Sequence, residues 1–133
     1  MRNNNISEAR RWTDEAESDI VAAEWLASGR FYSKACFLSQ QAAEKALKGY
    51  LISKGVRDTV GHSTDYLLQR CMRFDKTLKE FGRSCKRLDR HYIPTRYPDG
   101  LPEGTPHENY AEEDASEAIE MAKRVAKAVA DRM

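Results

Sequence analysis

This sequence has no long apolar run, and that absence excludes a membrane-spanning protein. A helix that crosses a bilayer needs about 20 consecutive, mainly apolar residues, and no stretch of the 133 residues provides them. The first residues, Met-Arg-Asn-Asn-Asn-Ile-Ser, also lack the apolar segment of a secretory signal. We therefore expect a cytoplasmic protein that makes no use of a membrane.

Cysteine is scarce as well, and its placement argues against metal binding. The three cysteines, Cys36, Cys71 and Cys85, are an odd number without the spacing of metal ligands, and each has helix-like apolar neighbours. We expect reduced, buried thiols. The chain also has no glycine-rich phosphate loop, no paired-carboxylate motif and no nucleophile elbow. These absences predict no metal and no cofactor.

Proline is absent from most of the chain, but four prolines occur between residues 94 and 106, one at every fourth position. Each lacks a backbone donor, so together they exclude a continuous helix there. The segment from His91 to His107 is therefore predicted to be irregular. A loop of this length in a compact domain is often functional or flexible.

The remaining sequence is typical of one helical domain spanning residues 1–133. Hydrophobic residues make up 41% and charged residues 32%. A chain of this length can bury a hydrophobic core without disulfides or metal ions to stabilise it. Apolar residues recur at three- and four-residue intervals, and no strand pattern occurs. The prediction is an all-α, up-and-down four-helix bundle that leaves room for a fifth short helix, with the proline-rich loop before the last helix.

Local signals set the expected helix ends. The first helix should run from Ser7 to Ser28 and stop at Gly29. Ser33 should cap the second helix, which should end at Gly55. The short connection between them favours an antiparallel hairpin.

Ser63 is expected to cap the third helix. A break near Asp75 leaves either one bent helix or two short ones, a choice that propensity does not settle. Asn109 and Glu112 have the spacing of a capping box for the last helix, whose apolar face is rich in alanine.

The formal net charge is only +1, but the charges are unevenly distributed. A basic cluster contains Arg83, Lys86, Arg87, Arg90 and Arg96, with only Asp89 among them. From Asp99 to Glu120, every charged residue is acidic. Such asymmetry can steer an anionic ligand or pair one subunit with another. The alternative is a pair of ordinary solvated helix faces.

The segment from Asp89 to Asp99 combines the residue types of a nucleotide or RNA site. Arg96 can fork onto a phosphate, and Tyr92 or Tyr97 can stack on a base. Asp89 or Asp99 can accept from a ribose hydroxyl or a base amine. The alternative is loop architecture, in which the tyrosines pack the turn and Arg96 pairs with a neighbouring aspartate.

A polar band on the second helix offers a second element of such a site. It contains Gln40, Gln41, Glu44, Lys45 and Lys48. In one interpretation, Gln41, Lys45 and Lys48 face the proline loop and complete an anion pocket. In the other, Glu44 and Lys48 form an ordinary (i, i+4) pair on a solvated face.

Four segments resemble the HEPN domain family. They are the helix that opens with Ala9-Arg-Arg-Trp12, the Gln40–Lys48 run, Gly61-His-Ser63 with Leu67-Leu68, and Leu88 to Asp99. The last of them also resembles the sacsin-like members. The resemblance implies an up-and-down bundle, commonly a homodimer, with a nucleotide- or RNA-related role. It also implies a nucleotidyltransferase partner in a two-component or toxin–antitoxin system.

The toxin-type members of the family are metal-independent endoribonucleases, which makes that activity the alternative function. Their motif is an arginine, a polar residue, three variable residues and a histidine. Arg57-Asp-Thr-Val-Gly-His62 has this spacing, although it lies in the loop after the second helix rather than at a late helix. The other candidate, His91, follows Arg87 at a distance one residue short. Whether the protein is an enzyme stays open at this point.

Overall fold

The computed structural model describes residues 2–133, in which helices account for all regular structure. The helices are α1 (Arg2–Ser28), α2 (Tyr32–Ser53), α3 (Thr64–Cys71), α4 (Gly82–Asp89), α5 (Pro106–Asn109) and α6 (Glu112–Asp131), with 3₁₀ turns η1 (Lys76–Phe81) and η2 (Pro98–Gly100). No strand occurs within residues 2–133. The all-α fold class predicted from the sequence is confirmed.

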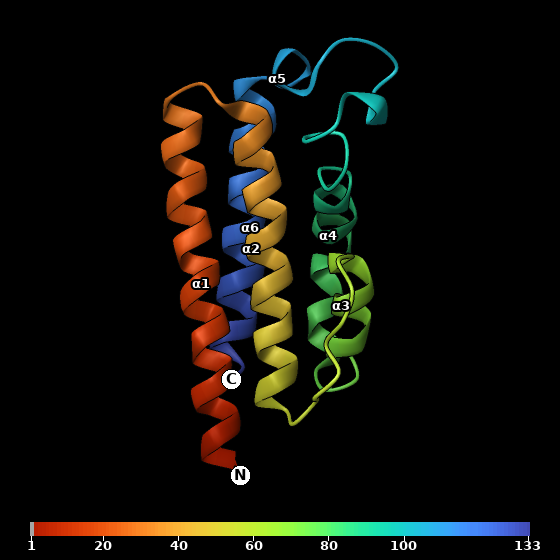
Figure 1. Ribbon diagram of the computed structural model, residues 1–133. Helices are drawn as coiled ribbons and strands as arrows, with labels where there is room; N and C mark the ends of the chain where they lie inside the picture. Colours follow the sequence, from red (N-terminus) through yellow and green to blue (C-terminus); the bar gives the residue numbers. More distant parts are fainter. Residues whose placement is uncertain (1) are drawn as a thin grey trace.

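The helix α2 lies at the centre of the molecule. It forms an antiparallel hairpin with α1, α6 packs beside both, and α3 and α4 cover the opposite side of α2 (Figure 1). The two chain ends lie at the same end of the bundle (Figure 1). No helix in the described part of the chain is long and apolar enough to cross a membrane.

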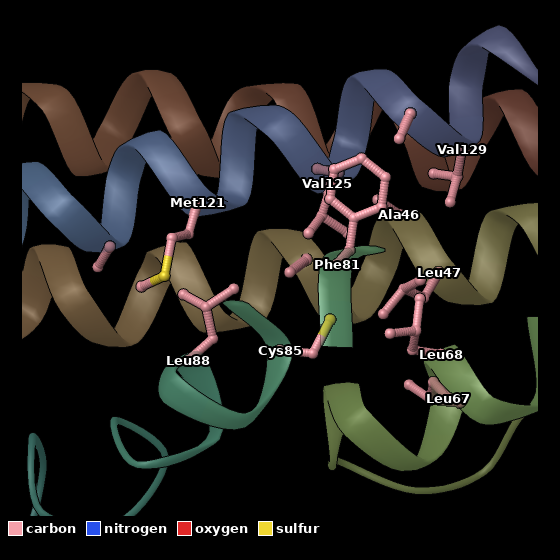
Figure 2. Close-up of a cluster of buried hydrophobic side chains, with 14 of the residues drawn as sticks. Ala46, Leu47, Leu67, Leu68, Phe81, Cys85, Leu88, Met121, Val125 and Val129 are labelled. Atoms are coloured by element: carbon pink, nitrogen blue, oxygen red, sulfur yellow. The ribbon is translucent and has the colours of Figure 1, made fainter. Parts of the chain in front are cut away.

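The core follows from the position of α2, because this helix buries side chains on several sides. Leu47 of α2, Leu68 of α3 and Val125 of α6 are almost completely buried, and Figure 2 shows them converging with Cys85 and Leu88 of α4. Burying one such side chain contributes about 1.5–3 kcal/mol. These contacts hold the short helices α3 and α4 against the long ones.

The connection between α1 and α2 departs from the prediction in two details. The helix α1 begins at Arg2 rather than Ser7 and ends at Ser28 as expected. The positive φ that closes the helix falls on Arg30 (68°), not on Gly29. The amide of Arg30 donates to the Ala27 carbonyl at 3.0 Å, and that of Phe31 donates to Leu26 at 2.8 Å. This pattern is a Schellman motif with an arginine at the left-handed position.

The start of α2 corrects a second expectation. Ser33 does not cap this helix, because Phe31 occupies the cap position and Ser33 lies within the first turn. The Ser33 hydroxyl is buried, and no described residue forms a hydrogen bond with it. The predicted stop at the other end is confirmed. Gly55 has a φ of +88°, and its amide donates to the Ile52 carbonyl at 2.9 Å.

The region of the third predicted helix contains two short helices. Ser63 caps α3 as predicted, since its hydroxyl accepts from the Tyr66 amide at 3.0 Å. Asp75 adopts an extended conformation that interrupts the helical structure. It caps η1, and its side chain accepts a hydrogen bond from the Thr77 amide at 2.9 Å. Beside the three long helices, the bundle is thus completed by the short helices α3 and α4 rather than by one long helix.

The proline-rich segment is irregular as predicted, apart from η2 and α5. The capping box expected at Asn109 is wrong. The side-chain amide of Asn109 donates instead to the backbone carbonyl of Thr105 at 2.8 Å. The helix α6 starts after Ala111, whose amide donates to the Asp114 carboxylate at 2.8 Å. The capping position therefore lies two residues later than the sequence indicated.

Candidate ligand site

Side chains from α2, from the loop before α3, from the end of α4 and from the segment after α4 meet on one side of the bundle. They are Phe37, Gln40, Glu44, His62, Asp89, Tyr92 and Arg96. We call this group the Arg96 site. Its members come from segments up to 59 positions apart, counted from Phe37 to Arg96, so only the tertiary fold assembles it.

Asp89 fixes the position of the loop in front of α3. Its carboxylate accepts from the amide of Thr64 at 2.7 Å and from the amide of Asp65 at 3.1 Å. It also accepts from the hydroxyl of Ser63 at 2.7 Å. The carboxylate therefore accepts hydrogen bonds from backbone amides at the start of α3 that have no acceptor within the helix. With both oxygens engaged, Asp89 positions the site rather than facing a ligand.

Gln40 ties the same loop to α2. This side chain is fully buried, and its amide nitrogen donates to the His62 carbonyl at 2.7 Å and to Asp89 at 3.3 Å. Its oxygen accepts from Gln41 at 2.8 Å. A buried amide that meets its hydrogen-bonding needs in this way specifies one arrangement of the surrounding chain.

Glu44 lies one turn further along α2 and orients His62. Its carboxylate is nearly buried, with one oxygen 3.3 Å from His62 Nδ1 and the other 3.2 Å from Lys48 Nζ. The imidazole itself is 63% exposed. No residue between 2 and 133 forms a hydrogen bond with its second ring nitrogen. This His–Glu pair presents a fixed imidazole to solvent.

Tyr92 and Arg96 complete the site through stacking. The His62 and Tyr92 rings are nearly parallel, with centroids 5.2 Å apart. The Arg96 guanidinium carbon lies 4.5 Å from the ring centroids of both Phe37 and Tyr92 and 5.0 Å from that of Tyr97. Its Nε donates to the Tyr92 carbonyl at 2.8 Å. Cation–π contact and this hydrogen bond hold the guanidinium in place.

Arg96 has no acidic partner in the described part of the chain, because none of the ion pairs within residues 2–133 includes it. No carboxylate of the described residues therefore neutralises its guanidinium. The predicted pairing of Arg96 with a neighbouring aspartate does not occur. The tyrosines do pack within the loop, and this packing leaves the Arg96 guanidinium without an ion pair to the described residues.

The predicted ligand residues are only partly brought together. Asp89, Tyr92, Arg96 and the half-exposed Tyr97 gather at the site. Asp99 is exposed in η2 and forms no side-chain hydrogen bond with the described residues. Both predicted lysines are engaged in ion pairs. Lys45 binds Asp19 of α1 at 2.7 Å, and Lys48 binds Glu44 and lies 6.0 Å from the Trp12 ring.

The candidate ribonuclease residues lie in different surroundings. Arg57 lines a groove of about 550 Å³ with Trp12 and the first residues of α1, whereas His62 faces Glu44 and Tyr92. His91 is largely buried against Tyr110, and its Nδ1 has no hydrogen-bond partner among residues 2–133. Burial lowers the pKa of His91. Of the two histidines, only His62 is both oriented and accessible.

Phe37 was not among the predicted site residues, and Gln40 and Glu44 were named only as members of the polar band on the second helix. Their spacing of three and four places them along one face of α2, and this spacing was the available signal. Within residues 2–133, no group of three or more His, Cys, Asp or Glu side chains can hold a metal ion.

Comparison with known proteins gives consistent matches over nearly the whole chain. The model of the HEPN domain matches residues 9–132. The crystal structure of TT1696 from Thermus thermophilus has a TM-score of 0.89 and 34% identity, covering 94% of this chain and 98% of that one. The crystal structure of ST0689, an archaeal HEPN homologue, has a TM-score of 0.79 and 40% identity, covering 93% and 96%.

A HEPN domain protein from Thermotoga maritima, tm0613, is more distant. Its crystal structure has a TM-score of 0.72 and 28% identity, covering 91% of this chain and 95% of that one. No protein of curated function matches the chain.

Proposed function

Since this chain belongs to the HEPN domain family, we propose that it is a nucleotide- or RNA-binding module whose ligand contacts Arg96. The observation that carries the proposal is the state of the Arg96 guanidinium. Three aromatic rings hold it at 4.5–5.0 Å, and no carboxylate within residues 2–133 neutralises it. A positioned, unpaired guanidinium is suited to bidentate contact with a phosphate.

The aromatic neighbours supply the second half of the recognition. Tyr97 is 49% exposed beside the guanidinium, and His62 presents its ring next to Tyr92. A nucleobase can stack on such surfaces, at about 1–3 kcal/mol per base. Asp99, an exposed carboxylate two residues after Tyr97, is the group that we assign to a ribose hydroxyl. Lys45 and Lys48 are assigned to the support of α2, because both are ion-paired.

The test is calorimetric titration of the protein at low salt with a nucleoside triphosphate and with a short RNA. Arg96→Ala should weaken binding by about 1.5–3 kcal/mol, the usual contribution of a charged hydrogen bond. Arg96→Lys keeps the charge but loses the fork, so its loss should be smaller. Arg11→Ala is the matched control, because Arg11 is exposed on α1 and pairs only with Glu8. Absence of binding by the unmodified protein would overturn the proposal.

We further propose that the module is a homodimer and acts with a nucleotidyltransferase or toxin–antitoxin partner, as its family suggests. Light scattering after size-exclusion chromatography tests the first statement, with a mass near twice 15.2 kDa expected. Co-purification with a co-expressed minimal nucleotidyltransferase tests the second. A monomer that fails to retain this partner would contradict both.

The alternative function, a metal-independent endoribonuclease, is favoured by one observation. Glu44 orients His62 through Nδ1 and leaves the exposed imidazole free to exchange a proton. A histidine in this state can serve as a general acid or base, and a nearby cation such as Arg96 can stabilise a phosphorane charge. Cleavage of RNA in the presence of chelator, lost in His62→Ala but kept in His91→Ala, would establish it. Intact RNA after long incubation would exclude it.

A further inference from the structure

The outer surface of η1 and α4 carries five exposed basic side chains that form no ion pair with any residue from 2 to 133. They are Lys76, Lys79, Arg83, Lys86 and Arg90. We call them the basic row. The whole chain has a net charge of only +1, so this concentration of unpaired positive charge is a local property of one surface.

Acidic residues within the same segment do not neutralise the basic row. The Asp75 carboxylate accepts from Thr77 and forms an ion pair with Arg132 at 2.9 Å. Asp89 turns inward to the start of α3. Only Glu80 keeps an exposed carboxylate without an ion pair between residues 76 and 90, all of which the structure describes.

The helix geometry places these cations along a continuous outer face. On α4, Cys85 and Leu88 are fully buried, while Arg83 and Lys86 are exposed, as is Arg90 at the C-cap that follows the helix. At 1.5 Å per residue, Arg83 and Arg90 are about 10 Å apart along the helix axis. In η1, side chains three positions apart eclipse one another, so Lys76 and Lys79 share an edge.

Two features distinguish this surface from a protein-binding face. Protein interfaces centre on apolar and aromatic residues and are depleted in lysine, whereas no large apolar side chain is exposed between residues 76 and 90. The basic row is also next to the Arg96 site along the chain, because Arg90 directly follows α4 and precedes Tyr92 by two residues. A row of cations that ends at stacking aromatic side chains matches the two recognition elements of a single nucleic-acid strand.

We propose that the basic row binds the phosphate backbone of a single-stranded RNA, one base of which occupies the Arg96 site. This inference rests on the proposed function and makes the ligand a polymer rather than a free nucleotide. Each neutralised phosphate releases counterions, so affinity falls with salt at a slope of about 0.7 per contact for single strands.

The experiment is a fluorescence-anisotropy titration of a labelled 12-nucleotide single-stranded RNA at several salt concentrations, alongside calorimetric titration with a nucleoside triphosphate. The variant R83Q/K86Q/R90Q removes three cations of the basic row. The matched control R2Q/R10Q/K34Q removes three exposed cations from α1 and the start of α2. All six side chains are exposed, so both variants should fold, and thermal unfolding verifies this.

The row variant should bind the RNA at least tenfold more weakly at low salt. Its salt slope should fall by about 2, since three contacts are lost. The control should change far less, and nucleotide binding should persist in both variants. Equal RNA affinity and equal slopes for the row variant and the control would overturn this inference and leave the proposed function standing. If the unmodified protein binds the nucleotide but no RNA, this inference is likewise overturned and the proposed function stands. If it binds neither ligand, both proposals are overturned.

Discussion

The Asp89 carboxylate at the end of α4 accepts a 2.7 Å hydrogen bond from the backbone amide of Thr64 at the start of α3. A carboxylate at a helix N-terminus is favoured by the helix dipole and replaces a missing intrahelical acceptor. This cap comes from a different helix. It therefore couples the packing of α3 against α4 to the position of the loop that carries His62.

Asp89→Ala should destabilise the fold. The variant leaves the Thr64 and Asp65 amides and the Ser63 hydroxyl without their acceptor. Loss of a cap together with charged hydrogen bonds should lower the free energy of unfolding by about 2–3 kcal/mol, measured by urea denaturation. Asp99→Ala is the control, because that exposed carboxylate forms no hydrogen bond with residues 2–133, and it should change stability by less than about 0.5 kcal/mol. Equal effects of the two substitutions would contradict the capping role.

Arg30→Gly should stabilise the protein. Arg30 adopts a φ of 68° at an exposed turn, a conformation that costs about 1–2 kcal/mol for a residue with a Cβ atom. Glycine avoids this strain but gains freedom in the unfolded chain, so the expected net gain is about 0.5–1 kcal/mol. Arg30→Ala keeps the strain and should show no such gain in the same urea titration. A loss of stability in the glycine variant would indicate that the arginine side chain contributes to the turn.

Stability should decrease as the pH falls below about 6.5, in part because of His91. Burial against Tyr110 is the main cause that lowers the pKa of His91 from its ordinary value of 6.5, opposed by the nearby carboxylates of Asp114 and Glu117. The unfolded chain therefore takes up the proton at a higher pH than the folded one. The contribution of His91 to the free energy of unfolding is fully present well above pH 6.5. It is lost progressively as the pH falls and the unfolded state becomes protonated.

The variant His91→Phe tests this contribution, since phenylalanine keeps an aromatic ring against Tyr110 and cannot titrate. Denaturation midpoints of the two proteins between pH 5 and pH 7.5 give the comparison. The variant should lose less stability over this range than the unmodified protein. Parallel pH profiles would show that His91 does not set the acid sensitivity.

The three cysteines should be unreactive in the folded protein. Burial raises the pKa of Cys36, Cys71 and Cys85 to about 12 each. Alkylation needs the thiolate, which is scarce at pH 8 under these conditions. Iodoacetamide at pH 8 should leave the native protein unlabelled and add three groups in denaturant, as counted by mass spectrometry. Rapid labelling of the native state would mean that the bundle opens more readily than its packing indicates.

Some features of the fold were predictable because they depend on local sequence. Ser63 caps α3, and Gly55 closes α2, because a short hydroxyl side chain and a residue without Cβ meet local needs of the backbone. The wrong expectations arose where two local signals competed. Asn109 and Ala111 both precede the acidic start of α6, and the chain uses Ala111 because the Asn109 amide is bound to Thr105.

The candidate site was predictable only in part, for a related reason. Tyr92, Arg96 and Tyr97 are close in sequence, so their types and order already indicated a phosphate and base site. Sequence spacing did not reveal that Asp89 faces α3 and that Lys45 faces α1, because these directions are set by partners at Thr64 and Asp19. A charged side chain takes the nearest partner in the fold, which can lie far away along the chain.

The sequence by itself determined that this protein is an all-α member of the HEPN family, since the helical period of its apolar residues and the order of its motifs are properties of the chain. Only the tertiary structure decided which charges remain available. It pairs Lys45, Lys48 and Asp89 within the bundle and leaves Arg96 and the basic row without an ion pair in the described part of the chain. The physical reason is that the Coulomb energy and hydrogen bonding of a side chain depend on distances of a few ångströms, and packing between helices sets those distances.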